Sequence, residues 1–296
     1  MIKKIKIAQG FEDQRLDKFL KKLFSNLSQS FIEKNLRKKN ILVNDLHVKS
    51  KYLVKKDDLL IIKNYSKAIY ADHKPKINKK KINKTQLMNF NDSILFENEN
   101  FFVIDKWCGI STQGGTNINI SIDTIIKNIS ENYNLVHRLD KETSGLLIIA
   151  KNLKYTKIFG KLFKSQNIKK TYLALCDGKP KMKESYVDLL LDNDKKDKLK
   201  TKTSYKVLSS NQKISLIKFE PKTGKKHQLR IVAKNIGSPI VGDGKYNIHN
   251  SKKNENLKLN AYKLEFKIDN DQFNFRSNLP KDFIDYMKQK RINFKE

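Results

Sequence analysis

Apolar residues recur at helical spacing in two short stretches near the N-terminus. In residues 14–23, Leu16, Phe19 and Leu20 fall on one side of a helix, and residues 30–36 repeat the spacing. The pattern therefore predicts two consecutive amphipathic helices.

Two apolar runs after these helices are typical of strands. Residues 41–45 end in an Asn-Asp turn, and residues 59–62 follow a Lys-Asp-Asp turn. We expect these elements to form one small ααβ domain over residues 1–63. The next stretch, residues 64–93, is rich in Lys and Asn and has no sustained apolar period, which predicts a linker.

The remaining residues, 94–296, mix strand-like and helical patterns, which predicts an α+β domain. The strand-like runs lie at residues 101–104, 145–150, 171–176, 214–219 and 261–268. The helical runs lie at residues 122–129 and 154–164.

The charge of the chain points to a polyanionic partner. Its 296 residues carry a formal net charge of +31, and 38% of them are hydrophobic, enough for a buried core. Binding to nucleic acid would offset the self-repulsion by releasing counterions. The alternative is compositional drift, because Lys, Asn and Ile are abundant throughout the chain, as in proteins of AT-rich genomes.

Arginine is scarce among the basic residues, so each arginine is a candidate for a specific role. A guanidinium binds carboxylates and phosphates through two parallel hydrogen bonds, which lysine cannot do. Six of the 62 basic residues are arginines, namely Arg15, Arg37, Arg138, Arg230, Arg276 and Arg291.

Several classes of protein are disfavoured by the sequence. No apolar run is long enough to span a bilayer and no signal peptide is evident, so we expect a cytoplasmic protein without a membrane partner. Cys108 and Cys176 lack the spacing of a zinc site or a disulfide framework, and we interpret both as buried thiols. His137 and His227 lie in separate motifs without a third ligand, so no metal is expected.

A carboxylate stands just before a fully apolar run. Asp140 belongs to the segment His-Arg-Leu-Asp, which is followed by Lys-Glu-Thr-Ser-Gly and the apolar residues 146–150. This order predicts a loop at the edge of a buried sheet, where a carboxylate can act as nucleophile or base. The alternative is that Asp140 only caps a helix or turn.

The whole segment, residues 137–151, resembles the catalytic motif of the RluA/RluC/RluD branch of the pseudouridine synthases. Further resemblances follow in the order of that family, at residues 105–115, 170–174, 223–230, 237–246 and 261–264. The chain departs from the family at Trp107, where Pro is usual, at Gln113, where His is frequent, and at Lys225-Lys226, where an Arg-Thr pair is preferred.

The resemblance implies an isomerase that converts uridine to pseudouridine without a cofactor, on a mixed, largely antiparallel sheet. It implies that Asp140 attacks the ribose or the base, or stabilises charge as the glycosidic bond breaks. Tyr172 would stack on the uracil or move a proton, although a strand tyrosine can also be a core residue. Arg230 would pair with Asp140 and hold it ionised and oriented.

Other residues are expected to bind RNA. Arg138 resembles the family residue that fills the gap left by a flipped base, with a phosphate contact as the alternative. Residues 12–62 resemble the S4 RNA-binding domain, although Asn40 and Asp45 stand where that family usually has Gly. The expected contacts to RNA are His137, Arg138, Arg15, Lys34, Arg37, Lys38 and Lys39. A solvated charged surface is the alternative for any one of them.

The S4-like domain and the QGG sequence at residues 113–115 most resemble the RluC type, whose substrate is 23S ribosomal RNA of the large subunit. The RluD type is the near alternative. We expect a monomer that binds this RNA or its precursor. A non-catalytic S4-type RNA-binding protein would explain the charge but would not need Asp140, Tyr172 and Arg230 together. A metal-dependent nuclease would need an acidic cluster that the motifs lack.

Overall fold

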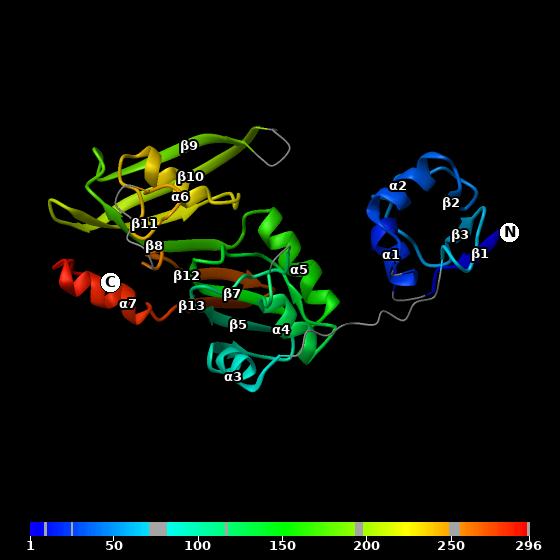
Figure 1. Ribbon diagram of the computed structural model, residues 1–296, viewed down its shortest axis with the longest axis horizontal. Coiled ribbons are helices and arrows are strands. Elements are labelled where there is room, and N and C mark those ends of the chain that lie inside the picture. The colour runs from blue at the N-terminus through cyan, green and yellow to red at the C-terminus, as the bar shows by residue number, and fades with distance from the viewer. Residues whose placement is uncertain are drawn as a thin grey trace. The chain divides into compact units, whose positions relative to one another are not determined.

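The computed structural model describes residues 1–8, 11–24, 26–70, 82–115, 118–192, 198–248 and 255–294. The chain divides into two compact units, Met1–Asn78 and Lys79–Glu296, each of which is described by itself (Figure 1).

The N-terminal unit is a small antiparallel sheet packed against two helices. Its elements are β1 (Lys3–Lys6), α1 (Leu16–Leu23), α2 (Gln29–Arg37), β2 (Ile41–Val43) and β3 (Leu59–Ile62), with strand order β1-β3-β2. Side chains from both helices and from β2 and β3 share one buried core. The two helices and two strands expected from the pattern are present, but β1 was not expected. Its sequence, KKIK, has no apolar alternation, and β1 is held by pairing with β3.

The stretch expected to be a linker, residues 64–93, differs from that expectation at its N-terminal end. Tyr65 and Tyr70 stack with their ring centroids 5.4 Å apart, and both contact the ring of Phe24 at the end of α1. Because Tyr70 is only 2% exposed, this segment belongs to the core of the N-terminal unit. Residues 71–81 lie outside the described residues.

The same stretch also ends in a helix, α3 (Lys84–Asp92). Asn83 and Gln86 exchange hydrogen bonds between side chain and backbone, which closes the N-terminus of α3 as a capping box. Phe90 anchors α3 in the core of the second unit.

The C-terminal unit is built on a ten-stranded sheet with the order β4-β5-β7-β12-β8-β11-β10-β9, to which β13 is added beside β12 and β6 beside β7. After α3, the elements are β4 (Ile94–Glu97), β5 (Phe101–Lys106), α4 (Ile122–Ile129), β6 (Asn134–Leu135), β7 (Ser144–Ala150), α5 (Leu153–Lys164), β8 (Lys169–Asp177), β9 (Glu184–Asp192), β10 (Lys198–Ser210), β11 (Ile214–Pro221), α6 (Gln228–Asn235), β12 (Leu259–Ile268), β13 (Asp271–Arg276) and α7 (Lys281–Gln289).

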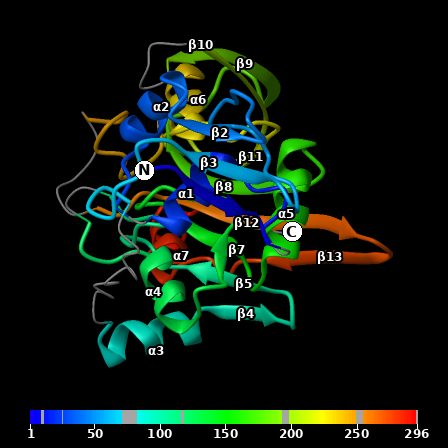
Figure 2. The ribbon, with the colours of Figure 1, turned by 90° about the vertical axis from the view of Figure 1, so that its right-hand side faces the viewer.

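The pairing of these strands confirms the α+β expectation and the largely antiparallel sheet. Among the described strands, β7 and β12 pair in parallel and the other neighbours pair antiparallel. The hairpin of β12 and β13 extends beyond the neighbouring strands at one end (Figure 2). The five expected strands of this unit lie within β5, β7, β8, β11 and β12, and the two expected helices lie within α4 and α5.

Helices cover both faces of the sheet, which explains its continuous apolar strands. Along β7, Leu147 and Ile149 pack with α3 and α4 on one face, whereas Leu146 and Ile148 pack with α5 on the other. Further along the sheet, α6 and α7 pack against alternate residues of β8 and β11 in the same way.

Candidate active site

Asp140 lies on the loop between β6 and β7, and its position is fixed by the backbone around it. The hydroxyl of Thr112 donates to the carbonyl of Leu139 at 2.7 Å and accepts from the amide of Leu139 at 3.1 Å. Gly145, directly after the loop, has φ +105°, and a Cβ there would lie 2.4 Å from the carbonyl oxygen of Ala261 on β12. Only glycine fits this approach of two paired strands, so the Thr-Ser-Gly sequence sets where the loop ends.

Lys106 is a buried lysine that ties the first motif to this loop. It is 0% exposed, and its Nζ donates to the carbonyls of Trp107 at 3.0 Å, Ile110 at 3.0 Å and Lys141 at 3.3 Å. Burial lowers the pKa of this ammonium to about 8. The amide of Gly109 also donates to Lys141. No role was expected for Lys106, because lysine is almost never fully buried in folded proteins.

Tyr172 lies on β8 and lines the same cleft as Asp140. Burial raises the pKa of its phenol well above the ordinary value, and the negative charge of Asp140 raises it further. The hydroxyl of Tyr172 is therefore protonated at neutral pH. Its ring also packs against the cores on both sides of the cleft, so its packing role and its place in the site coexist.

Arg230, near the start of α6, binds a partner that was not expected. Its Nε and one terminal nitrogen donate to the two carboxylate oxygens of Asp243 at 2.8 and 2.7 Å. The other terminal nitrogen lies 3.8 Å from a carboxylate oxygen of Glu142. The expected pairing of Arg230 with Asp140 is therefore wrong as a direct ion pair. Burial alone would lower the pKa of Arg230, but Asp243, Asp140 and Glu142 together raise it, so Asp140 acts on it at longer range.

Asp243 is held by its own loop. Its Oδ1 accepts hydrogen bonds from the amides of Lys245 and Tyr246 at 3.0 Å each. Although burial opposes ionisation, Arg230 and these amides lower the pKa of Asp243. The ring of Tyr246 lies 5.3 Å from the guanidinium carbon of Arg230, and its hydroxyl contacts Nδ1 of His227 at 3.1 Å. Residues 242–246 therefore form a clamp on Arg230.

His137 is part of the scaffold of the cleft. Its Nε2 accepts a hydrogen bond from the amide of Ile148 on β7 at 2.8 Å, and its ring lies 4.7 Å from that of Phe163. Burial and the nearby Lys170 lower the pKa of His137 to about 3. The imidazole is neutral at pH 7, with its proton on Nδ1, and does not offer the positive charge expected of a phosphate contact.

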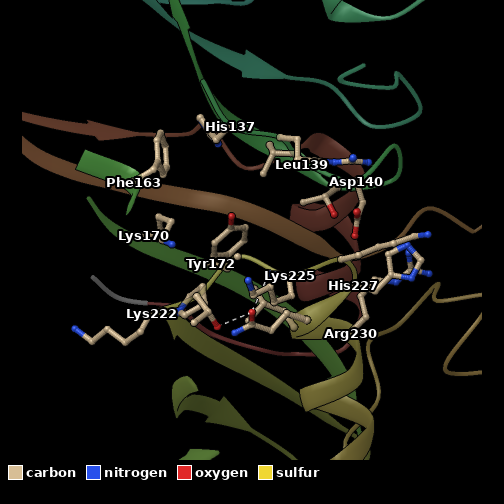
Figure 3. Close-up of a pocket in the computed structure, with 18 of the residues that line it drawn as sticks. His137, Leu139, Asp140, Phe163, Lys170, Tyr172, Lys222, Lys225, His227 and Arg230 are labelled. Atoms are coloured by element: carbon tan, nitrogen blue, oxygen red, sulfur yellow. Dashed lines mark hydrogen bonds between the residues drawn. The ribbon is translucent and has the colours of Figure 1, made fainter. Parts of the chain in front are cut away.

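The C-terminal unit contains a cleft of about 640 Å³ (Figure 3). Asp140, Tyr172 and Arg230 all line it, as do His137 and the exposed Arg138. Within the described part of the chain, no three His, Cys, Asp or Glu side chains are grouped as a metal site requires.

The remaining residues expected to bind RNA belong to the N-terminal unit. Lys34, Arg37, Lys38 and Lys39 are exposed along and after the last turn of α2. Arg15 differs from them, because its guanidinium donates to both oxygens of the buried Asp17 at 3.1 and 2.6 Å. The guanidinium of Arg15 therefore neutralises the buried negative charge of Asp17 at the start of α1.

The chain is similar to known RNA pseudouridine synthases. A family model described as RNA pseudouridylate synthase matches residues 100–235. The chain is 37% identical to a Rickettsia felis protein named ribosomal large subunit pseudouridine synthase C, over 92% of this chain and 95% of that protein. It is 32% identical to a Buchnera aphidicola protein of the same name, over 82% and 80% of the two chains. A Borreliella burgdorferi protein named ribosomal large subunit pseudouridine synthase D is 33% identical over 66% of this chain and 67% of its own.

Two solved human structures share the fold. Human RNA pseudouridylate synthase domain containing 4 covers 72% of this chain and 98% of its own, with a TM-score of 0.62 and 24% identity. Human RNA pseudouridylate synthase domain containing 1 covers 63% of this chain and 82% of its own, with a TM-score of 0.54 and 21% identity.

Proposed function

The chain belongs to the RNA pseudouridylate synthase family, and on this premise we propose that it isomerises selected uridines of large-subunit (23S) ribosomal RNA, with Asp140 as the catalytic carboxylate. The observation that carries the proposal is a cleft in which Asp140 is the only acidic residue among the described lining residues, together with Tyr172 and Arg230. The names of the Rickettsia and Buchnera relatives support the substrate.

The reaction is an isomerisation, so it requires neither an oxidant nor a second substrate. The bond from N1 of uracil to C1′ of ribose breaks, the base turns over, C5 bonds to C1′, and the hydrogen at C5 is exchanged for one at N1. Asp140 attacks the ribose or the base, or stabilises positive charge as the bond breaks. The hydrogen bonds of Thr112 and Lys106 to the loop that carries Asp140 hold the carboxylate in position for these steps.

Tyr172 and Arg230 support Asp140 in different ways. Because the phenol of Tyr172 is protonated, it serves as an aromatic surface for uracil or as a hydrogen-bond donor. Arg230 supplies a fixed positive charge near Asp140, and one of its terminal nitrogens lies 3.8 Å from Glu142.

The RNA is held by cations outside this centre. Arg138, exposed at the cleft, fills the gap left by the flipped uridine. The N-terminal unit is an S4-type module that grips structured RNA through Lys34, Arg37, Lys38 and Lys39, with Arg15 and His137 in structural roles beside their RNA contacts.

The same proposal places the protein in the cytoplasm as a monomer. None of the helices among the described residues is both long and apolar enough to cross a bilayer. Light scattering of the purified chain, alone and with an rRNA fragment, tests the oligomeric state.

The experiment that tests the function is a map of pseudouridines in 23S rRNA from cells with and without the gene. We expect specific positions to lose pseudouridine in the deletion and to regain it when the wild-type gene is returned. A map that does not change would reject large-subunit rRNA as the substrate.

A further inference from the structure

Two lysines stand in the cleft on the side of Tyr172 away from Asp140. In Figure 3, Lys170 and Lys222 lie to the left of Tyr172, whereas Asp140 and Arg230 lie to its right. Lys170 projects from β8 and is partly buried, and Lys222 directly follows β11. Burial lowers the pKa of Lys170, and the positive charge of Lys222 lowers it further.

The positive charge at this end of the cleft is not compensated. Among the described residues, seven Lys or Arg residues line the cleft against one acidic residue, Asp140. Arg230 is neutralised by Asp243, but within the described residues neither Lys170 nor Lys222 has a carboxylate oxygen within 4.0 Å. The positive charge of Lys170 also lowers the pKa of His137, which is neutral.

A partly buried ammonium without a counter-ion is unfavourable, since it loses hydration and gains no partner. The N-terminal neighbour of Lys170 shows the contrast. Lys169 precedes Lys170 on β8, so its side chain points to the opposite face of the strand. Its Nζ lies 3.7 Å from a carboxylate oxygen of Glu220 and from one of Glu265. The chain therefore compensates the outward lysine and leaves the inward one for an anion from outside.

We infer that Lys170 and Lys222 form a subsite for one phosphodiester of the RNA, next to the uridine that reacts at Asp140. The inference rests on the proposed function, because only an RNA substrate brings a phosphate into the cleft together with a uracil. Lysines are suited to this task as point charges, and a phosphodiester group supplies one negative charge and acceptor oxygens. The subsite would fix which way the strand enters the cleft and so which face of the ribose meets Asp140.

The first experiment compares Lys170→Gln, Lys222→Gln and the double variant with wild type in single-turnover reactions on an rRNA fragment. The enzyme concentration for half-maximal rate should rise on the order of tenfold in the double variant, and the slope of log affinity against log salt should shrink by about 0.7 for one lost contact to single-stranded RNA. Lys267→Gln, an exposed lysine on β12, removes the same charge elsewhere and should behave as wild type.

Lys170→Arg keeps the charge and should restore most of the affinity. An unchanged salt slope in the double variant would overturn the inference, as would equal losses in the Lys267→Gln control. Loss of rate at saturation with unchanged affinity would also overturn it, since that result assigns Lys170 to the base or the ribose.

The second experiment identifies the phosphate. RNAs are made in which one linkage, 5′ or 3′ of the target uridine or one step further out, carries a neutral methylphosphonate. One linkage should weaken wild-type binding by the same factor as the double variant does, and the double variant should lose nothing more at that linkage. Losses that multiply at every linkage would reject the subsite. Wild type on unmodified RNA is the reference: absence of pseudouridine there would reject the proposed function instead.

Discussion

Arg230 is bound through two hydrogen bonds to Asp243 and reaches Asp140 only through its charge. Residues 242–246 therefore hold the Arg230 side chain in place. Its remaining terminal nitrogen faces Glu142 on the loop that carries Asp140. Such an arrangement supplies a positive charge that cannot follow Asp140 if the loop moves. We therefore expect Asp243 to act as a positioning residue for the reaction.

Replacing Asp243 tests that role. Asp243→Asn keeps the shape but leaves Arg230 without its charged partner, so the unfolding free energy should fall by about 3 kcal/mol, the low end for breaking a buried ion pair. Turnover should fall on the order of tenfold while the KM for RNA changes little. Asp188→Asn, on the exposed face of β9, is the matched control and should change neither quantity. A variant that lost RNA affinity but kept its turnover would contradict the positioning role.

Arg230→Lys preserves charge and isolates geometry. Lysine can replace only one of the two bonds to Asp243, so we expect a loss of turnover on the order of tenfold, about 1.4 kcal/mol, with binding nearly unchanged. Arg291→Lys, at an exposed arginine after α7, is the matched control for the loss of a guanidinium. Single-turnover rates at saturating enzyme decide the matter, and a rate within about twofold of wild type would show that charge alone suffices.

Lys106 should control the catalytic loop without touching RNA. Lys106→Met leaves three carbonyl oxygens without their donor, so the loop should loosen and turnover should fall about tenfold or more at unchanged RNA affinity. Lys258→Met removes another buried lysine, which pairs with Asp282 of α7. We expect both variants to be destabilised but only Lys106→Met to expose the amide of Gly109 to hydrogen exchange. Equal turnover in the two variants would exclude a specific role for Lys106.

The buried imidazole of His137 predicts how stability depends on pH. Its pKa is about 3 in the folded chain and 6.5 in an exposed histidine, so the unfolded state binds the proton more tightly. The contribution of His137 to the free energy of unfolding is therefore fully present above pH 6.5. It is lost as the pH falls from 6.5 toward 3, at up to about 1.4 kcal/mol per pH unit.

His137→Gln offers an acceptor for the amide of Ile148 without a titratable ring, so its unfolding free energy should decline less steeply below pH 6.5. The fluorescence of Trp107, the one tryptophan of the chain, reports on the C-terminal unit. His47→Gln serves as the exposed control. Parallel curves for His137→Gln and wild type would contradict the assignment.

The parts of the fold that could be predicted are those in which local pattern and tertiary packing agree. The helical spacing of Leu16, Phe19 and Leu20 and the apolar run of β7 both correspond to buried faces. The capping box of Asn83 and Gln86 indicates the start of a helix, so α3 could have been predicted inside the expected linker. By contrast, β1 has no pattern of its own, because its hydrogen bonds come from β3.

Only those site residues could be predicted that lie within a short sequence motif of known function. The resemblance brought Asp140, Tyr172 and Arg230 to one cleft, and the structure joins them there. The pairing of Arg230 with Asp243 could not be predicted from the sequence. It depends on how the chain folds back after α6 and brings Asp243 beside Arg230. Lys106 and Lys170 were equally hidden, since the sequence does not tell an inward lysine from the many outward ones.

The central claim is that Asp140 performs the chemistry, and release of tritium from C5-labelled uridine in an rRNA fragment tests it most directly. Asp140→Asn removes the charge and nucleophilicity of one carboxylate and leaves the cationic surface intact, so RNA affinity should stay within about threefold of wild type. Glu131→Gln, an exposed carboxylate just before β6, is the matched control. We expect wild type and Glu131→Gln to release tritium at the same rate and Asp140→Asn to release none above background. Appreciable release by Asp140→Asn would contradict the account.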